Sequence, residues 1–295
     1  MKIKFWGVRG SIPVPGPKTV KYGGNTSCIE IRTDEGDLII LDGGTGIFQL
    51  AQDLRGKMPV AANIFITHGH WDHIQGLPLF TPMFVAGNRL LFHGAYDFVS
   101  ERGVEQVVGV QLQYSFFPVR EAEMKATIEY FVLSPGQSVR SGSATVTAVL
   151  LNHTMINFGY RVESNGKSVF FTGDHEPYYN IYHPADERYP EYQALIEEKE
   201  RAIADAVRGV DVLIADASYT LEEYPAKKGW GHGTLDSCID LAERAGAKIL
   251  YCTHHEPTRD DQALEHEFGR ALARHSPRQG GVECRLAREG EEVEI

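Results

Sequence analysis

Cysteine is scarce in this chain, and its cysteines stand far apart. The 295 residues include four of them, none in a CxxC spacing: Cys28, Cys238, Cys252 and Cys284. A zinc ribbon or a disulfide framework needs closer, repeated spacings, so neither is indicated. Cys28 and Cys252 lie in apolar, strand-like stretches, where we expect them to be small core residues.

Long apolar runs and an excess of positive charge are also missing. No run approaches the roughly 20 apolar residues that a membrane-spanning helix needs, and the start, MKIKFWGVRGS, has no long apolar core of a secretory signal. The formal net charge of −11 argues against neutralising the phosphates of long nucleic acid. We therefore expect a cytoplasmic protein with no membrane partner and no long nucleic-acid partner.

The composition itself is that of an ordinary globular protein. Hydrophobic residues make up 42% and charged residues 23% of the chain, and low-complexity tracts are absent. A chain of this length is near the size at which a single core stops growing. We expect one domain over residues 1–295, with an insertion at about 85–134, where helical and extended patterns mix.

Strand patterns and helical patterns follow each other twice along the chain. Short apolar stretches bounded by turn residues predict strands at 3–8, 28–33, 37–42, 63–68, 157–161, 168–172, 211–218 and 248–254. Amphipathic periodicity predicts helices at 47–54, 194–207, 235–245 and 262–275. This order predicts two sheets packed together with helices outside.

The densest group of metal-ligand side chains is the segment His68-Gly69-His70-Trp71-Asp72-His73, directly after an apolar strand. In an extended turn, His68 and His70 can point one way while Asp72 and His73 point another, so one segment can serve two adjacent ions. Neutral imidazole and carboxylate suit Zn²⁺, and also iron or manganese. The alternative, histidines that are merely solvated in a turn, is disfavoured by the density of ligands.

Three more ligand-type residues each follow an apolar strand. His153 comes after VTAVLLN, Asp174 after SVFFTG, and His254 after KILYCT. Functional side chains are commonly placed on loops at the ends of such elements. We expect these three side chains to complete the site begun by the histidine-rich segment.

Together these motifs resemble the metallo-β-lactamase superfamily. The match runs in order through Asp42 in LDGGTG, the HxHxDH segment at 68–73, His153, Asp174 in TGD and His254 in THH. The opening MKIKFWGVRGSIPVPGPKTVKYGGNTSCIEI looks like that of a bacterial group of phosphodiesterase-like metallo-hydrolases within the superfamily. The resemblance implies a four-layer αββα sandwich of α/β (α+β) class, with two mixed sheets and outer helices.

The resemblance also implies a centre with two divalent metal ions, Zn²⁺ foremost and Mn²⁺ or iron as alternatives. Asp174 would bridge the two ions, and His255 competes with His254 for the last position. We favour His254 because it directly follows its strand and looks like the histidine of the Thr-His step in related phosphodiesterases. The implied ligands are His68, His70 and His153 for the first ion, and Asp72, His73 and His254 for the second.

A later segment, LIADASYTLEEYPAKKGWGHGTLD, resembles the tRNase Z and phosphodiesterase branch. On that resemblance Asp216 orients His232, which contacts the scissile phosphate or protonates the leaving oxygen. The alternative for His232 is a surface histidine beside a helix N-cap at Thr234. For Asp216 the alternative is a turn-forming carboxylate at a strand end.

The same resemblance favours a small substrate. The tRNA-gripping arm of tRNase Z is inserted between the positions of His153 and Asp174, but here only residues 154–173 separate them, 20 in all, mostly a hairpin around Asn165-Gly166. Where relatives commonly continue from the third histidine with Pro-Gly-Gly, this chain has Thr154-Met155-Ile156-Asn157. That departure leaves the adjoining pocket wall undefined.

We therefore expect a dinuclear metal-dependent phosphodiesterase that acts on a small phosphodiester, such as a cyclic nucleotide, by attack of a hydroxide bridging the ions, with Asp72 orienting it. The alternatives are a thioester or lactone hydrolase of the same fold and a non-catalytic, metal-containing sensor or binding module. Aromatic residues at Tyr114, Phe116 and Phe117 suit core packing first. The alternatives are a cap over a base or other flat substrate and a homodimer interface.

Overall fold

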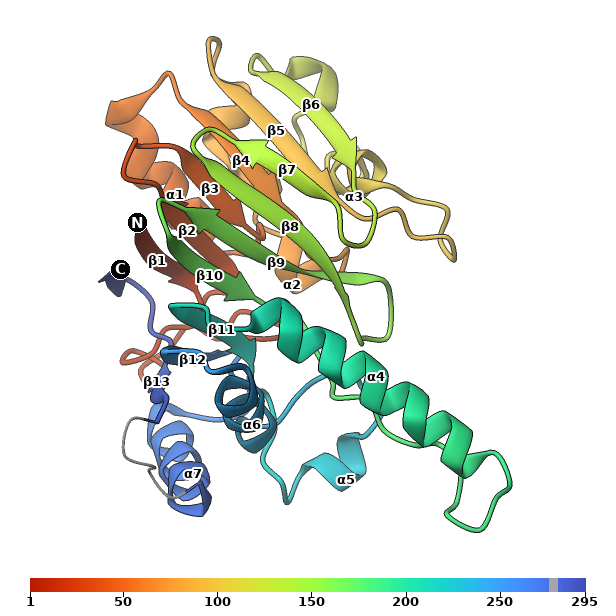
Figure 1. Ribbon diagram of the computed structural model, residues 1–295. Coiled ribbons are helices and arrows are strands. Elements are labelled where there is room, and N and C mark those ends of the chain that lie inside the picture. The colour runs from red at the N-terminus through yellow and green to blue at the C-terminus, as the bar shows by residue number, and fades with distance from the viewer. Residues whose placement is uncertain (276–280) are drawn as a thin grey trace.

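The computed structural model describes residues 1–275 and 281–295. Within this described part, two seven-stranded mixed sheets pack face to face (Figure 1). In spatial order the first sheet contains β14 (Glu292–Glu294), β1 (Lys2–Gly7), β2 (Cys28–Arg32), β3 (Leu38–Leu41), β4 (Ala61–Phe65), β5 (Arg89–Gly94) and β6 (Thr127–Val132). The second contains β13 (Glu283–Leu286), β12 (Ile249–Thr253), β11 (Val212–Asp216), β10 (Lys167–Phe171), β9 (Asn157–Ser164), β8 (Ala144–Leu151) and β7 (Ser138–Ser141).

Helices cover the outer faces of both sheets, which confirms the αββα expectation. The first sheet carries α1 (Ile47–Leu54), α2 (Trp71–Ile74) and α3 (Val104–Gln111), with short 3-10 turns η1 (Arg55–Lys57), η2 (Leu77–Leu79), η3 (Thr81–Phe84) and η4 (Glu121–Glu123) on this half. The second half carries α4 (Tyr189–Val207), α5 (Tyr224–Lys227), α6 (Leu235–Ala245) and α7 (Asp261–Arg274). No helix of the described residues is long and apolar enough to cross a membrane.

Some strands are apolar at every position because both of their faces are covered. In β3, Ile39 and Leu41 enter the core between the sheets, whereas Leu38 and Ile40 enter the core beneath α1. Successive side chains of a strand point to opposite faces, so one strand supplies both cores. Each such side chain contributes about 1.5–3 kcal/mol when buried.

Parallel pairing brings the functional strand ends to one edge. In the first sheet β3 and β4 run parallel, and in the second β10, β11 and β12 do the same. Their carboxyl ends therefore meet, and the residues that follow them converge. The β9–β10 hairpin turns at Asn165 and Gly166, which have φ of 50° and 74°, and it occupies most of the span between His153 and Asp174.

The range predicted as an insertion contributes to the sheet at both its ends. Strands β5 and β6 are parallel neighbours at one edge of the first sheet. The connection between them, residues 95–126, leaves the sheet and carries α3 and η4. This connection is the part of the range that lies over the helical face of the first sheet, since Val104 and Val108 pack in the core beneath it.

Candidate metal centre

The histidine-rich segment changes from extended chain to helix at its midpoint. His70 is the extended N-cap residue of α2, with φ of −67° and ψ of 149°, and α2 begins at Trp71. His68 and His70 therefore alternate along an extended stretch and face the same way, whereas Asp72 and His73 lie on the first helical turn. This local change of conformation directs the two halves of the motif to two neighbouring places.

The first of these places gathers three imidazole nitrogens and a carboxylate oxygen. Nε2 of His68 lies 2.9 Å from Nδ1 of His70, and Nε2 of His153 lies 3.1 Å from the same Nδ1. Oδ2 of Asp174 lies 3.5 Å from Nε2 of His68 and 3.8 Å from Nε2 of His153. The four ligand atoms lie within 4.8 Å of one another.

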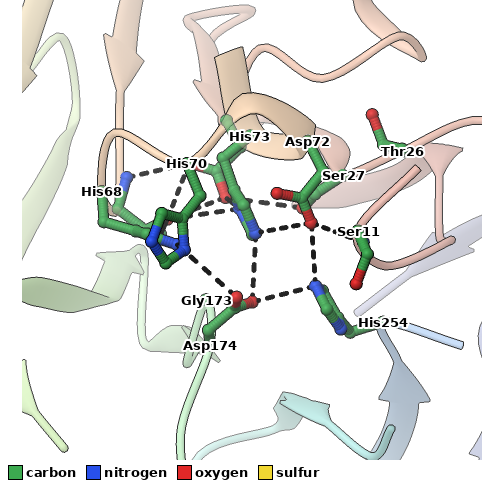
Figure 2. Close-up of polar contacts among 12 residues, drawn as sticks. Ser11, Thr26, Ser27, His68, His70, Asp72, His73, Gly173, Asp174 and His254 are labelled. Atoms are coloured by element: carbon green, nitrogen blue, oxygen red, sulfur yellow. Dashed lines mark hydrogen bonds and ion pairs between the residues drawn. The ribbon is translucent and has the colours of Figure 1, made fainter. Parts of the chain in front are cut away.

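The second place uses the other oxygen of the same aspartate (Figure 2). Oδ1 of Asp174 lies 3.1 Å from Nε2 of His73 and 3.2 Å from Nε2 of His254. Oδ2 of Asp72 lies 3.4 Å from Nε2 of His73 and 3.1 Å from Nε2 of His254. Asp174 therefore contacts both groups, one oxygen to each.

These residues fit a pair of divalent cations. Nε2 of His73 and Oδ1 of Asp174 are buried and have no hydrogen-bond partner anywhere in residues 1–275 and 281–295. Such buried polar atoms are costly unless something satisfies them. Because these unsatisfied atoms face each other among nitrogen and oxygen ligands, a metal ion is the group that suits them.

The structure separates His254 from its competitor His255. His255 is fully buried, and its Nε2 donates to the carbonyl oxygen of Ala287 at 2.8 Å, away from Asp174. His254 takes a left-handed backbone conformation, with φ of 57°, and so does Asp42, with φ of 64°. Asp42 directly follows β3, and His254 directly follows β12. Backbone strain of this kind is more frequent at functional sites.

Two buried carboxylates hold the histidine rings in place. Oδ2 of Asp42 lies 2.7 Å from Nδ1 of His73, and its carboxylate also accepts from the hydroxyl of Thr67, which lies 3.1 Å from Nδ1 of His68. The hydrogen-bond network places the proton of His73 on Nδ1, which leaves Nε2 free to bind metal. Asp42 thus supports one histidine directly and another through a hydroxyl group.

Asp216 does the same on the other side of the site. Its Oδ2 lies 2.9 Å from Nδ1 of His232, and its Oδ1 accepts from the hydroxyl of Ser218 at 2.7 Å. That hydroxyl lies 2.7 Å from Nδ1 of His254. Nδ1 of His153 donates instead to the carbonyl oxygen of Gly231 at 2.7 Å. The rings of His232, His254 and His153 are therefore all held through Nδ1, and Nε2 of each ring points away from the group that holds it.

The predicted pair of Asp216 and His232 lies beside the two ligand groups. The His232 ring stacks on that of His254, with centroids 4.8 Å apart, and its Nδ1 lies 3.7 Å from Oδ2 of Asp174. Its side chain is 13% exposed, and that of Asp216 is fully buried. Asp174, Asp216, His232 and His254 form a third group of close ligand-type atoms, but Nδ1 of His232 is already bonded to Asp216.

Burial and neighbouring charges shift the pKa values of these groups. Burial alone would raise the pKa of Asp174, but the surrounding histidines, His254 foremost, hold it well below its usual range. Burial lowers the pKa of His68 well below its usual value, which favours the neutral imidazole that binds metals. Burial would also lower the pKa of His232, but Asp216 and Asp174 outweigh burial and raise it.

Two glycines allow loops to press against the ligands. A Cβ on Gly10 would lie 2.3 Å from the His254 ring, and one on Gly231 would lie 2.2 Å from Nδ1 of His153. Next to Gly10, the backbone N–H of Ser11 donates to Oδ2 of Asp72 at 2.7 Å. Sequence reasoning missed these contacts, and the only signal for Ser218 is its position two residues after Asp216.

Known proteins share the fold of this chain. Residues 38–255 match the family described as Beta-lactamase superfamily domain. Ribonuclease Z of Methanosarcina mazei is 25% identical over 86% of this chain and 87% of that protein. The crystal structure of the metallo-beta-lactamase fold protein YhfI from Bacillus subtilis superposes with a TM-score of 0.69 at 18% identity, over 99% of this chain and 98% of that one. A diphosphatase from the PhnP family superposes with a TM-score of 0.63 at 19% identity, over 100% and 97% of the chains.

Proposed function

Because this chain belongs to the Beta-lactamase superfamily domain family, we propose that it is a dinuclear metal-dependent phosphodiesterase that hydrolyses a small phosphodiester such as a cyclic nucleotide. The observation that carries the proposal is the shared carboxylate of Asp174, whose two oxygens serve two separate ligand groups. The pair formed by His232 and Asp216, directly beside that carboxylate, supports the phosphodiester over other substrates.

Zn²⁺ is the metal we propose, with Mn²⁺ or iron as alternatives, because the donors are imidazole nitrogens and carboxylate oxygens. When bound, two such ions lower the pKa of a shared water and stabilise charge on an attacked phosphoryl oxygen. His68, His70 and His153 would hold one ion, and Asp72, His73 and His254 the other, with Asp174 between them.

The protein's own residues supply orientation and a proton. Asp72, fixed by the N–H of Ser11, is placed to accept a hydrogen bond from the attacking water. Asp216 holds the Nδ1 proton of His232, which leaves Nε2 to contact the phosphate or to protonate the leaving oxygen. General acid catalysis of this kind contributes about 10²–10⁴-fold in rate.

The chain's shape and charge support the proposal of a small substrate. Residues 154–173 form the β9–β10 hairpin and its flanks, without an added arm, and the formal net charge is −11. The relatives named above, a ribonuclease and a diphosphatase, both carry names that refer to reactions at phosphorus. The ribonuclease name refers to RNA, whereas we propose a compact phosphodiester for this chain because a strongly acidic protein is poorly suited to long polyanions.

The test is hydrolysis of bis(p-nitrophenyl) phosphate by metal-stripped and reconstituted protein. Activity should depend on added Zn²⁺ or Mn²⁺ and should collapse in His70→Ala. Full turnover by the metal-stripped protein would refute the proposal. Unchanged turnover in His232→Ala would favour a thioester or lactone substrate, and tight ligand binding without any hydrolysis would favour a sensor.

A further inference from the structure

A cavity of about 440 Å³ lies beside the metal centre. One side is formed by α2 and the turn after it, with Trp71 and Gln75, and the other by α3 and the following turn, with Gln111, Phe116 and Phe117. Its volume is within the range of small-molecule sites, about 300–1,000 Å³. The cavity therefore has room for a compact organic group.

Its position connects it to the reaction site. Trp71 stands between His70, a member of the first ligand group, and Asp72, a member of the second. The indole does not take part in the core, since 78% of Trp71 is exposed. The segment that supplies ligands to both groups therefore also forms one wall of the cavity.

Arg102 brings a positive charge to the lining of the cavity. It lines this cavity and also a second, small one of about 20 Å³ that is bounded by His68 and Gly69. Arg102 is exposed, and its guanidinium makes no hydrogen bond or ion pair within residues 1–275 and 281–295. An unpaired cation at this place suits an anionic group that extends from the cavity towards the metal ligands.

The lining matches one chemical class, a flat heteroaromatic ring attached to a phosphate. Trp71 and Phe116 offer aromatic faces for stacking, and the amide groups of Gln75 and Gln111 offer donors and acceptors for a ring edge. Nε2 of Gln111 is buried and has no hydrogen-bond partner in residues 1–275 and 281–295. Purely apolar packing would not use these amides or Arg102.

We propose that this cavity binds the base of a nucleotide phosphodiester, stacked on Trp71 and Phe116, while Arg102 contacts its phosphate. The inference rests on the proposed phosphodiesterase function and narrows its substrates to those that carry a nucleobase. It also gives the connection 95–126 a role, because α3 and the turn after it form one wall of the base site.

The test compares adenosine 5′-monophosphate with ribose 5-phosphate, which has a phosphate but no base. Calorimetric titration of the metal-loaded protein should show the base-containing ligand binding about ten- to hundredfold more tightly, as expected for stacking of one base. Phe116→Ala should remove most of that preference. Because 73% of Phe116 is exposed, its truncation leaves the core intact.

The matched control is Phe98→Ala. Phe98 is 80% exposed on the same connection but does not line the cavity, so this variant should keep the full preference. Equal binding of the two ligands by the wild-type protein would overturn the base site. Equal binding together with a dimer that Phe116→Ala dissociates, measured by light scattering, would assign the face to a second copy of the chain.

Hydrolysis of bis(p-nitrophenyl) phosphate, measured on the same preparations, keeps the two proposals apart. Metal-dependent turnover with no preference for the base refutes the base site and leaves the phosphodiesterase in place. A preference for the base without any turnover refutes the phosphodiesterase and supports the cavity as a nucleotide-binding site.

Discussion

Glu176 provides the sharpest test of how the site is held together. It is 2% exposed, and its Oε1 accepts from the hydroxyl of Tyr224 at 2.7 Å and from the N–H of Gly229 at 2.8 Å. Its Oε2 accepts from the N–H of Gly231 at 2.9 Å. The carbonyl oxygen of Gly231 in turn accepts a hydrogen bond from Nδ1 of His153, and His232 is the next residue. One buried carboxylate thus fixes the loop that supports both histidines.

Glu176→Gln keeps the volume of the side chain and removes one acceptor. If the amide oxygen retains the Oε1 position, the amide NH₂ faces the N–H of Gly231, and that hydrogen bond is lost. A hydrogen bond to a charged group is worth about 1.5–3 kcal/mol, so we expect the free energy of unfolding to fall by about 2 kcal/mol. Removal of groups that orient metal ligands lowers metal affinity or activity about 10–100-fold. Because Glu176 contacts His153 only through Gly231, we expect the smaller effect, a kcat/KM about tenfold lower.

The assay pairs urea unfolding with the kcat/KM for bis(p-nitrophenyl) phosphate. Glu200→Gln is the matched control, because Glu200 accepts from the N–H of Tyr178 and from Arg244 and forms no hydrogen bond to the described residues 224–233. The control should lose stability but retain kcat/KM. If Glu176→Gln loses stability and also retains wild-type kcat/KM and metal affinity, Glu176 does not position the site.

Three further predictions concern the ligands and the thiols. Asp42→Asn should lower metal affinity about 10–100-fold, measured by competition with a chelator. If the amide oxygen keeps its bond to Thr67, the amide NH₂ faces Nδ1 of His73, which loses its acceptor; unchanged affinity would contradict this role. Gly10→Ala should displace His254 and release metal from the second group first, measured as metal content after dialysis; retention of both ions would argue otherwise. Burial raises the pKa of the Cys28, Cys238 and Cys252 thiols well above the usual value and that of the Cys284 thiol to about 11. At pH 8 the folded protein should therefore react slowly with a disulfide reagent and the unfolded protein rapidly. Fast reaction of the folded protein would refute this.

The parts of the site that the sequence predicted are those with a local signal. The segment at 68–73 is dense in ligands, and each of His153, Asp174 and His254 follows an apolar strand. Strands β10 and β12 each pair in parallel with β11. Strand β8 runs in the same direction as β10, because both are antiparallel to β9. The residues that follow these three strands therefore lie at one edge of the second sheet, which is a property of the sheet and not of any one motif. The αββα layers followed from the same order of strands and helices.

The parts that were missed have no such signal. The carbonyl of Gly231, the hydroxyl of Ser218 and the carboxylate of Glu176 support ligands from distant elements. Nothing in the spacing of Gly231 and Glu176 marks them, and Ser218 is marked only by its place two residues after Asp216. A helix was predicted at 194–207, but α4 begins at Tyr189 with a proline in its first turn. Its first two turns bury no residue, since Ile196 is the first buried one, so they lack the apolar periodicity on which the prediction depended.

The boundaries of the 85–134 range were also hard to predict. Strands β5 and β6 pair in parallel and need a long crossover, so the extended patterns are separated by residues 95–126 with a helical pattern between them. Parallel strands require such a connection. Sequence periodicity alone does not tell a crossover from an inserted segment.

Metal content per chain tests the central claim most directly. After metal stripping and reconstitution with Zn²⁺, elemental analysis of the wild-type protein should give about two ions per chain, and hydrolysis of bis(p-nitrophenyl) phosphate should rise until the second ion is bound. Asp174→Ala should lose that stoichiometry, because both ligand groups use its carboxylate. A wild-type protein that binds one ion or none, or that is fully active without metal, would contradict the dinuclear site.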